Sequence, residues 1–421
     1  MPISREFEDR LSPVLEKVAR HFGTPFHIYD EEGIRKTGRL VIDAFSGVKD
    51  FMEYFAVKAL PNPRILGIMK SMGFGFDCSS IPELVLGRRA GAVAEELMFT
   101  SNNTTDEEFR VALSDGGCIL NLDDITLISK VPAMPELICF RYNPGPERTG
   151  NDIIGKPEEA KYGVSSDQIV DAFRMARELG ATRFGLHTML VSNELNHAYM
   201  VETAQMLSDT AERITSRLDI RFEFFNIGGG FGIPYRPGEA GLDIAAMGKG
   251  VADIMKRFKE KNGYEPAFHI ESGRYMTGSH GVLVTRAINK KNTYRNYVGV
   301  DACMSALMRP AIYGAYHEIT VHGKKDADAG APVDVVGALC ENNDKFAVQR
   351  MLPDVSEGDL LVIHDTGAHG HSMGFNYNGR LRPKELLLRT DGSVELIRRE
   401  ETIEDHFATL EFDEHILQGN V

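Results

Sequence analysis

Apolar residues follow two alternating patterns between about residues 50 and 290. Short runs rich in β-branched and aromatic residues predict strands, and longer amphipathic stretches between them predict helices. The predicted strands are MEYFAVK (52–58), FGFDCS (74–79), LMFTS (97–101), CILNLD (118–123), ICFRYN (138–143), RFGLHT (183–188), FEFFNIG (222–228) and AFHIES (267–272). PNPRILGIMKSMG, which opens near proline, and SDQIVDAFRMARELG, which ends at glycine, are examples of the predicted helices. Eight strands that alternate with helices predict a (β/α)8 barrel.

Beyond about residue 280 the chain changes to strands without helices between them. These runs are GVLVTRAI, NYVGVDAC, YHEITVHG, PVDVVGALC, DLLVIHDTG, KELLLR and SVELIRR. We therefore predict an α/β part and a β part: a (β/α)8, TIM-like barrel over residues 30–285, and a β-rich domain, a β-barrel or sandwich, formed by residues 1–29 and 286–421. Because no low-complexity linker separates them, the two parts are expected to pack closely.

Charge and composition exclude several kinds of partner. The 421 residues carry 47 Lys and Arg against 61 Asp and Glu, a net charge of −14 that repels nucleic acid and anionic membranes. No run of about 18 apolar residues predicts a membrane span, and the charged N-terminus does not resemble a signal peptide, so a cytoplasmic protein is expected. The five cysteines contain no Cys-x-x-Cys pair, which argues against zinc and disulfide scaffolds.

Polar residues fall at the ends of the predicted barrel strands. The loops at the C-terminal ends of barrel strands converge on one mouth, where barrel enzymes carry their chemistry. The residues at these ends are Lys58, Asp77, Ser79, Asn102, Asn121, Arg141, His187, Gly228, Gly229, Gly230 and Glu271. We therefore expect a functional face at this mouth.

Lys58 stands in the segment YFAVKALPNP, where it closes an apolar run and is followed by a turn bounded by prolines. Apolar surroundings are expected to lower the pKa of a lysine and make its amine a nucleophile toward carbonyl groups. The alternative is a lysine that reaches from a strand end into solvent.

Two further segments each allow two interpretations. The glycines of IGGGFGIPY (227–235) place bare backbone N–H groups where an anion such as phosphate can approach, or they form a tight turn. In HIESGRYMTG (269–278), Glu271 and Arg274 suit the ring nitrogen and an anionic group of a pyridine cofactor, or they form a surface ion pair.

Three histidines near residue 370 raise the question of a metal. His364, His369 and His371 alternate closely in HDTGAHGHSMGFNYN, but no carboxylate or cysteine stands near them in a recognisable ligand spacing. The neighbouring glycines favour a tight functional loop, and no metal site is predicted.

An ordered series of motifs from residue 24 to residue 387 carries a family resemblance. The motifs are TPFHIYD, YFAVKALPNP, FDCSSIPEL, RYNPG, NIGGGFGIPY, ESGR, DACM, RPAIYGAYH, CENND, GAHG and FNYNGRLRPKELL. Together they resemble the fold-III pyridoxal-phosphate decarboxylases, and among these the diaminopimelate decarboxylases most of all. The resemblance implies pyridoxal 5'-phosphate as cofactor, a barrel that binds it and a β-rich domain that completes the active site.

The resemblance also implies roles for individual residues. Lys58 would hold the cofactor as an internal aldimine, and Glu271 would pair with the ring nitrogen. The other residues implied in cofactor binding are Asp77, His187, Met189, Ser192, Gly228, Gly229, Gly230, Arg274 and Tyr377. Those implied in substrate binding are Arg274, Arg309, Tyr313 and Tyr377, with Glu341 as the contact of the distal amino group.

Family members act as homodimers with shared active sites. The resemblance implies that the loop of Cys340 and Glu341 reaches the partner's barrel and that Cys340 donates the proton to the product. The reaction implied is decarboxylation of meso-2,6-diaminopimelate to L-lysine and carbon dioxide, through a carbanion delocalised over the cofactor ring.

Three departures from the family pattern keep other substrates open. Met189 stands where the family has a histidine that stacks on the cofactor ring, and a thioether packs on aromatic rings but does not titrate. Asn342 and Asn343 replace the Ser-Gly or Ser-Ser that usually follows Cys-Glu, and His369 replaces a tyrosine. A decarboxylase of lysine, ornithine, arginine or a D-amino acid remains an alternative, as does an inactive cofactor-binding regulatory protein.

Overall fold

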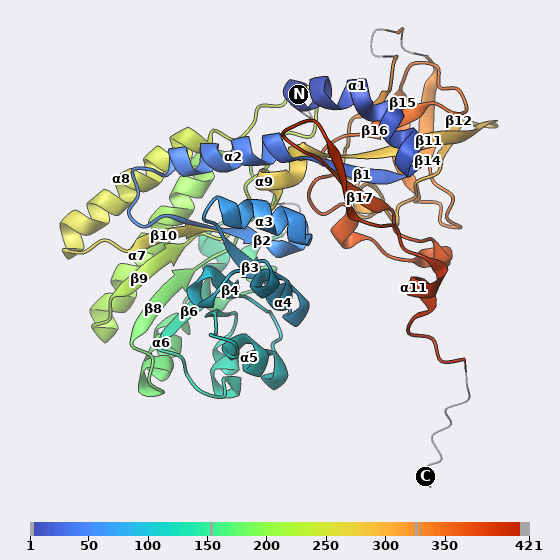
Figure 1. The fold of residues 1–421 in the computed structure, drawn as a ribbon. Helices are drawn as coiled ribbons and strands as arrows, with labels where there is room; N and C mark the ends of the chain where they lie inside the picture. Colours follow the sequence, from blue (N-terminus) through green and yellow to red (C-terminus); the bar gives the residue numbers. More distant parts are fainter. Residues whose placement is uncertain (1–3, 152–154, 325–326, 329, 413–421) are drawn as a thin grey trace.

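The fold contains two β-sheets and eleven α-helices among residues 4–151, 155–324, 327–328 and 330–412, which the computed structural model describes (Figure 1). The helices are α1 (Arg5–Phe22), α2 (Glu31–Ala44), α3 (Pro63–Ser71), α4 (Ile81–Arg89), α5 (Asp106–Leu113), α6 (Ile169–Glu178), α7 (His197–Leu218), α8 (Ile244–Asn262), α9 (Arg274–Thr277), α10 (Arg309–Tyr313) and α11 (Ile403–Phe407).

The first sheet closes into a barrel of eight parallel strands. Its strands are β2 (Met52–Ala56), β3 (Gly75–Cys78), β4 (Leu97–Phe99), β5 (Ile119–Leu122), β6 (Leu137–Asn143), β8 (Arg183–His187), β9 (Phe222–Asn226) and β10 (Ala267–Ile270). Pairing of β5 with β6 and of β10 with β2 completes the ring. The predicted barrel and all eight of its strands are confirmed. A short strand, β7 (Val164–Ser165), pairs with β6 and was not predicted.

Both faces of the barrel strands are buried, which explains why they are continuous apolar runs in the sequence. The inward side chains, including Tyr54, Met98 and Phe224, form one cluster inside the barrel. The outward side chains pack under the helices in a larger cluster. At the start of α3 the Asn62 side chain accepts a hydrogen bond from the Arg64 N–H, which caps the helix that proline was predicted to open.

The second sheet is formed by both ends of the chain. Its strands are β1 (Phe26–Asp30), β11 (Gly281–Asn292), β12 (Asn296–Val300), β13 (Ile319–Val321), β14 (Pro332–Val336), β15 (Lys345–Met351), β16 (Leu360–Ile363), β17 (Lys384–Leu388) and β18 (Val394–Arg398). Strand β1 lies between β11 and β17, antiparallel to the first and parallel to the second. The predicted strands beyond residue 280 are all present, whereas β1 and β15 were not predicted as strands.

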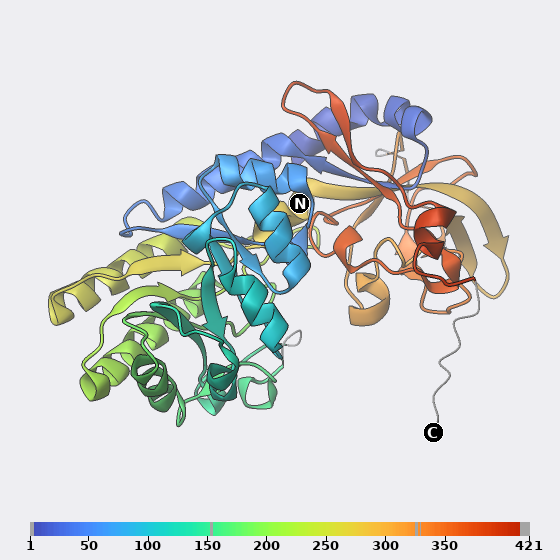
Figure 2. The same cartoon turned by 60° about the horizontal axis from the view of Figure 1, so that its bottom comes forward.

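The barrel and the second sheet lie side by side, as Figures 1 and 2 show from two directions. The N–H of His369 donates a 2.9 Å hydrogen bond to the carbonyl of Ala59, the residue after Lys58. The second sheet thus touches the mouth of the barrel beside a predicted site residue. The exact residues at which the chain passes between domains, predicted near 30 and 285, stay a prediction.

None of the helices in the described ranges is long and apolar enough to cross a membrane.

Candidate active site

A cavity of about 470 Å³ opens at the C-terminal ends of the barrel strands. The predicted site residues that line it are Lys58, Asp77, His187, Met189, Ser192, Gly229, Gly230, Glu271, Arg274 and Tyr313. Ser79, Asn102 and Arg141, predicted at strand ends, line it as well. Asn121 lies beneath the cavity and donates a 3.1 Å hydrogen bond to the Thr100 hydroxyl. The strands therefore bring the polar ends together as their parallel order requires.

Lys58 lies at the floor of this cavity on the short 3-10 turn Val57–Ala59 that follows β2. Its Nζ donates a 3.0 Å hydrogen bond to Oδ2 of Asp77, and half of the side chain is accessible. Desolvation acts to lower the pKa of Lys58, but the carboxylates of Asp77 and Glu271 outweigh it and raise that pKa. The lowered pKa expected from the apolar sequence is therefore wrong.

Glu271 follows β10 and is held by one side chain from β9 and one from β8. Asn226 donates a 2.8 Å hydrogen bond to its Oε1, and His187 Nε2 lies 3.1 Å from its Oε2. Because a carboxylate accepts this second bond, Nε2 of His187 carries the proton. Burial acts to raise the pKa of Glu271, but His187, Lys58 and Asn226 together lower it below its ordinary value. Glu271 is thus a buried, ionised carboxylate.

The three glycines form a tight turn, of which Gly229 and Gly230 line the cavity and Gly228 does not. Gly228 and Gly230 have φ of 68° and 93°, which favour glycine. A Cβ on Gly229 would lie 2.2 Å from the Glu271 carbonyl oxygen, and one on Gly230 would lie 2.3 Å from the Val191 carbonyl oxygen. The N–H of Gly229 points to Sδ of Met189 at 3.2 Å. Glycine is therefore required here by the close approach of neighbouring backbone.

A second cavity of about 450 Å³ continues from the first and shares four of its residues: Ser192, Arg274, Tyr313 and His369. Arg309 and Tyr235 line only this second cavity. Arg274 donates a 2.5 Å hydrogen bond to the Tyr235 hydroxyl, and the guanidinium carbon of Arg309 lies 4.6 Å from the centre of the same ring. Among the described residues, no carboxylate forms an ion pair with either arginine.

Three predicted residues beyond residue 330 lie outside both cavities of their own chain. Cys340 is exposed, and its N–H donates a 2.7 Å hydrogen bond to the side chain of Asn378. Glu341 accepts a bond from the backbone of Asn343, and the Tyr377 side chain is half exposed. The structure therefore does not bring these three residues to Lys58 within one chain.

The three histidines considered for a metal make separate contacts. His364 Nε2 bonds to Thr320, His371 Nε2 bonds to the Pro383 carbonyl, and His369 lines both cavities. Over the described ranges, no group of three or more His, Cys, Asp or Glu side chains is arranged to hold a metal ion.

Sequence reasoning missed several residues of the site. Asn226, Tyr235 and His317 hold the charged side chains in place, and Tyr162 lines the first cavity 4.4 Å from the Arg141 guanidinium. Asn226 stands at the end of the seventh predicted strand, so the rule of polar strand ends was sufficient to find it. Tyr235 and His317 end the motifs NIGGGFGIPY and RPAIYGAYH named above, which were not read residue by residue, whereas no comparable signal marks Tyr162.

Comparison with known proteins assigns the family. Residues 34–278 match the family model of the pyridoxal-dependent decarboxylases, pyridoxal binding domain. The chain belongs to the pyridoxal-dependent decarboxylases. It is 45% identical to Protein TabA of Pseudomonas amygdali pv. tabaci, over 98% of this chain and 97% of that protein. It is 35% identical to the diaminopimelate decarboxylase of Methanothermobacter thermautotrophicus, over 92% of each chain.

Solved structures agree with this family. The diaminopimelate decarboxylase of M. jannaschii, solved with L-lysine, aligns with a TM-score of 0.88 at 29% identity, over 94% of each chain. The protein is therefore a pyridoxal-phosphate-dependent amino-acid decarboxylase.

The cavity at the barrel mouth fits the family's cofactor. Oδ1 of Asp77 and Nδ1 of His187 are buried there without a hydrogen-bond partner among the described residues. The cavity brings three groups together: the Lys58 amine, which can react with an aldehyde, the buried Glu271 carboxylate, which suits a protonated ring nitrogen, and the turn of Gly229 and Gly230.

Proposed function

We propose that the protein decarboxylates meso-2,6-diaminopimelate to L-lysine and carbon dioxide. The supporting observation is the pair Arg274 and Arg309, which face the cavities beside Lys58 without a carboxylate partner in the described ranges. A substrate that loses one carboxylate and keeps the other suits Arg309 as the partner of the retained carboxylate, while Arg274 lies where it can face that substrate or the cofactor phosphate. The relatives named diaminopimelate decarboxylases, and the L-lysine complex of one solved structure, favour the same substrate.

Five residues of the first cavity would hold the cofactor. Lys58 would bind it covalently, Glu271 would pair with its ring nitrogen, and Gly229, Gly230 and Arg274 would face its phosphate. When bound, the cofactor supplies an electron sink for the electron pair that remains on the reacting carbon after carbon dioxide departs.

Other wall residues would shape this pocket. Asp77 keeps a negative charge beside Lys58, and His187 holds the Glu271 carboxylate in place. Ser192 lines both cavities, where it would contact the phosphate or the substrate. Met189 packs against the glycine turn and would take the place of a ring-stacking histidine.

The substrate would lie across the two cavities. Arg309 would bind the retained carboxylate, assisted by Tyr313, whose side chain is more than half exposed at the cavity rim. The wall of the second cavity does not include the Cys340 loop of the same chain.

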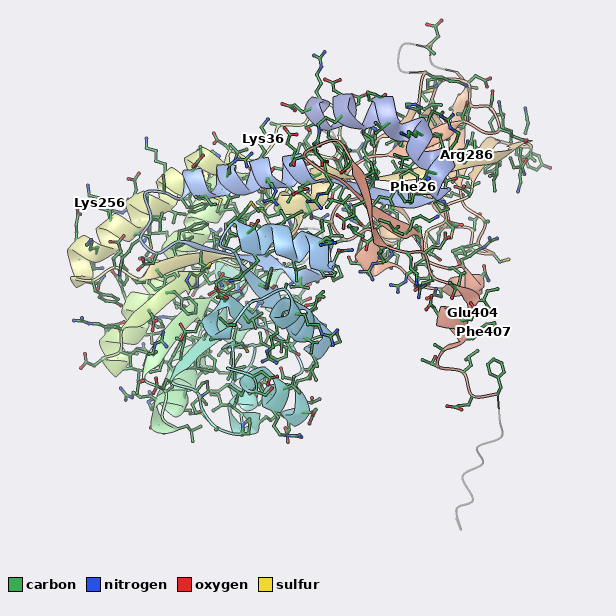
Figure 3. All side chains as sticks on the ribbon, in the orientation of Figure 1. Phe26, Lys36, Lys256, Arg286, Glu404 and Phe407 are labelled. Carbon is green, nitrogen blue, oxygen red and sulfur yellow. The ribbon has the colours of Figure 1, made fainter. Side chains whose placement is uncertain are left out.

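Cys340, Glu341 and Tyr377 would act in the barrel of a second copy of the chain. This arrangement explains why all three lie outside the cavities of their own chain. Cys340 would return the proton to the reacting carbon, and Glu341 would bind the distal amino group. Exposed apolar side chains on and after α11, Ile403, Phe407 and Phe412, offer surface for the partner (Figure 3 labels Phe407).

A decarboxylase of another basic amino acid is the second candidate. Identity to Protein TabA, 45%, exceeds the 35% to the diaminopimelate decarboxylase compared above. Met189 and His369 also change the wall of the cavity. An inactive regulator is not favoured, because Lys58 and Glu271 are both present in the geometry that chemistry needs.

The test is carbon dioxide release by cofactor-loaded protein given meso-diaminopimelate, L-lysine, L-ornithine, L-arginine or D-lysine in parallel. We expect release from diaminopimelate and its loss in Lys58→Ala, with Lys49→Ala at the barrel base as a matched control. Preference for another amino acid would establish the second candidate. Activity should survive a metal chelator and disappear on removal of the cofactor.

A further inference from the structure

Arg309 is a buried cation with an incomplete set of partners. Only 5% of the residue is exposed, yet no carboxylate of the described chain pairs with it. Its two contacts of note are the face of Tyr235 and a 2.9 Å hydrogen bond from Nη1 to Nε2 of His317. A buried, unneutralised guanidinium is costly unless a ligand completes it.

His317 is held in one tautomer by the other side of its ring. Nδ1 lies 2.7 Å from the backbone carbonyl oxygen of His364, and a carbonyl only accepts, so Nδ1 carries the hydrogen. Nε2 is then left with a lone pair, which accepts from Arg309. Burial first, and then the charge of Arg309, lowers the pKa of His317 to about 3, so the ring stays neutral near pH 7.

The two neighbours of Arg309 do different things. Tyr235 supports the guanidinium through its ring face, and such a contact tolerates rotation of the guanidinium within its own plane. The bond to His317 is directional and fixes that rotation, so the remaining N–H groups keep one orientation. His317 is itself fully buried and packs edge-on against Tyr235, with ring centres 5.2 Å apart.

We propose that His317 is a positioning residue that orients Arg309 to bind the carboxylate the substrate retains. The proposal rests on the proposed function, because it deepens the assignment of Arg309 as the receptor of that carboxylate. Pre-orientation reduces the entropy lost when a carboxylate binds, so the benefit falls on ligands that carry the carboxylate and not on those that lack it.

The test uses two probes that differ by one carboxylate, L-lysine and 1,5-diaminopentane. Their dissociation constants are measured by calorimetry on the cofactor-loaded wild type and on two variants. His317→Asn keeps a donor for the His364 carbonyl but is too short to reach Arg309, whereas His317→Gln places an acceptor near the position of Nε2. We expect His317→Asn to weaken L-lysine binding about 10-fold or more and His317→Gln to restore it to within about 3-fold, while binding of 1,5-diaminopentane stays unchanged.

The outcomes separate the proposal from the proposed function. If wild type prefers L-lysine and His317→Asn keeps the full preference, His317 does not position Arg309. Equal weakening of both probes would mean a merely structural role and would also overturn the proposal. If the wild type itself does not distinguish the two probes, Arg309 does not bind the retained carboxylate. The proposed function is then overturned before the role of His317 is tested. His317→Phe, which keeps a ring against Tyr235, serves as the second variant if His317→Asn fails to fold.

Discussion

Asn226 and Glu271 are joined by a 2.8 Å hydrogen bond from Nδ2 to Oε1, at the ends of two neighbouring barrel strands. The other oxygen of the carboxylate accepts from His187 at 3.1 Å. Each oxygen therefore has a donor, and the carboxylate is ionised and fixed although it is buried. A fixed negative charge of this kind suits a ring nitrogen that must stay protonated while it withdraws electrons.

Glu271→Gln is expected to lower the rate of decarboxylation by about 100-fold or more, because the amide keeps the shape but loses the charge. The measurement is kcat for carbon dioxide release, together with the visible spectrum of the bound cofactor. Glu95→Gln, a carboxylate at the opposite end of the barrel, is the matched control and should leave kcat unchanged. Near-normal kcat in Glu271→Gln, with an unaltered spectrum, would remove Glu271 from the ring-nitrogen role.

Gly229→Ala is expected to weaken cofactor binding at least about 10-fold, because the new Cβ would lie 2.2 Å from the Glu271 carbonyl oxygen and force the turn to move. The dissociation constant of the cofactor, from equilibrium dialysis of the apoprotein, measures this effect. Gly241→Ala is the control, since its Cβ would meet no atom nearer than 3.9 Å. Equal cofactor affinity in both variants would contradict the role proposed for the turn.

The architecture was predictable because each barrel strand is buried on both faces and gives an uninterrupted apolar run. The same rule did not find β15, where Val348, Gln349 and Met351 are exposed, nor β1, where three polar residues interrupt the apolar pattern: His27, Tyr29 and Asp30. These polar residues are tolerated because they have buried partners: Tyr29, for example, donates a 2.6 Å bond to Glu385. Partners so distant in sequence leave no local signal.

The site shows the same limit. Strand ends indicated which residues would meet, since parallel strands in a closed ring place their ends at one mouth. The expected pKa of Lys58 was wrong because it weighed only the apolar neighbours in sequence, whereas the carboxylates of Asp77 and Glu271, at two of the same strand ends, raise that pKa. Tyr235 and His317 come from segments 82 residues apart (317 − 235) and meet only in the folded chain.

Glu385 connects the second sheet to the segment that carries Lys58. Its oxygens accept bonds from Tyr29 at 2.6 Å, from Asn62 at 3.2 Å and from Arg398, which also donates to the carbonyl of Pro61 at 2.8 Å. Burial acts to raise the pKa of Glu385, but His371, Arg398 and Tyr29 outweigh it and keep that pKa below the ordinary 4.5. The folded state therefore favours the charged carboxylate.

Glu385→Gln is expected to lower the free energy of unfolding by about 2 kcal/mol at pH 7, because a charged acceptor is lost from a buried network. Since the pKa is lower in the folded than in the unfolded chain, this stabilisation is complete above pH 4.5 and is lost as the pH falls below it. Urea unfolding of wild type and variant at several pH values should show their difference shrinking on acidification. Glu401→Gln, which contacts Arg382 and not the Lys58 segment, is the control and should lower the free energy of unfolding by less, because Glu401 is less buried than Glu385. A difference that grows below pH 4.5 would contradict a lowered pKa of Glu385 in the folded chain.

Mixing two inactive variants tests whether active sites are shared. Lys58→Ala removes the amine in the barrel, and Cys340→Ala removes a thiol that lies outside both cavities of its own chain. If Cys340 acts in the partner's barrel, half of the randomly assorted dimers are mixed and each has one intact site, so about a quarter of wild-type activity should return. Mixing Lys58→Ala with Glu271→Gln should restore nothing, because both changes affect the barrel and every barrel in the mixed dimer is defective. Mixed dimers that form, as shown by native mass spectrometry, but stay inactive in the first pair would place the action of Cys340 within its own chain or outside the reaction.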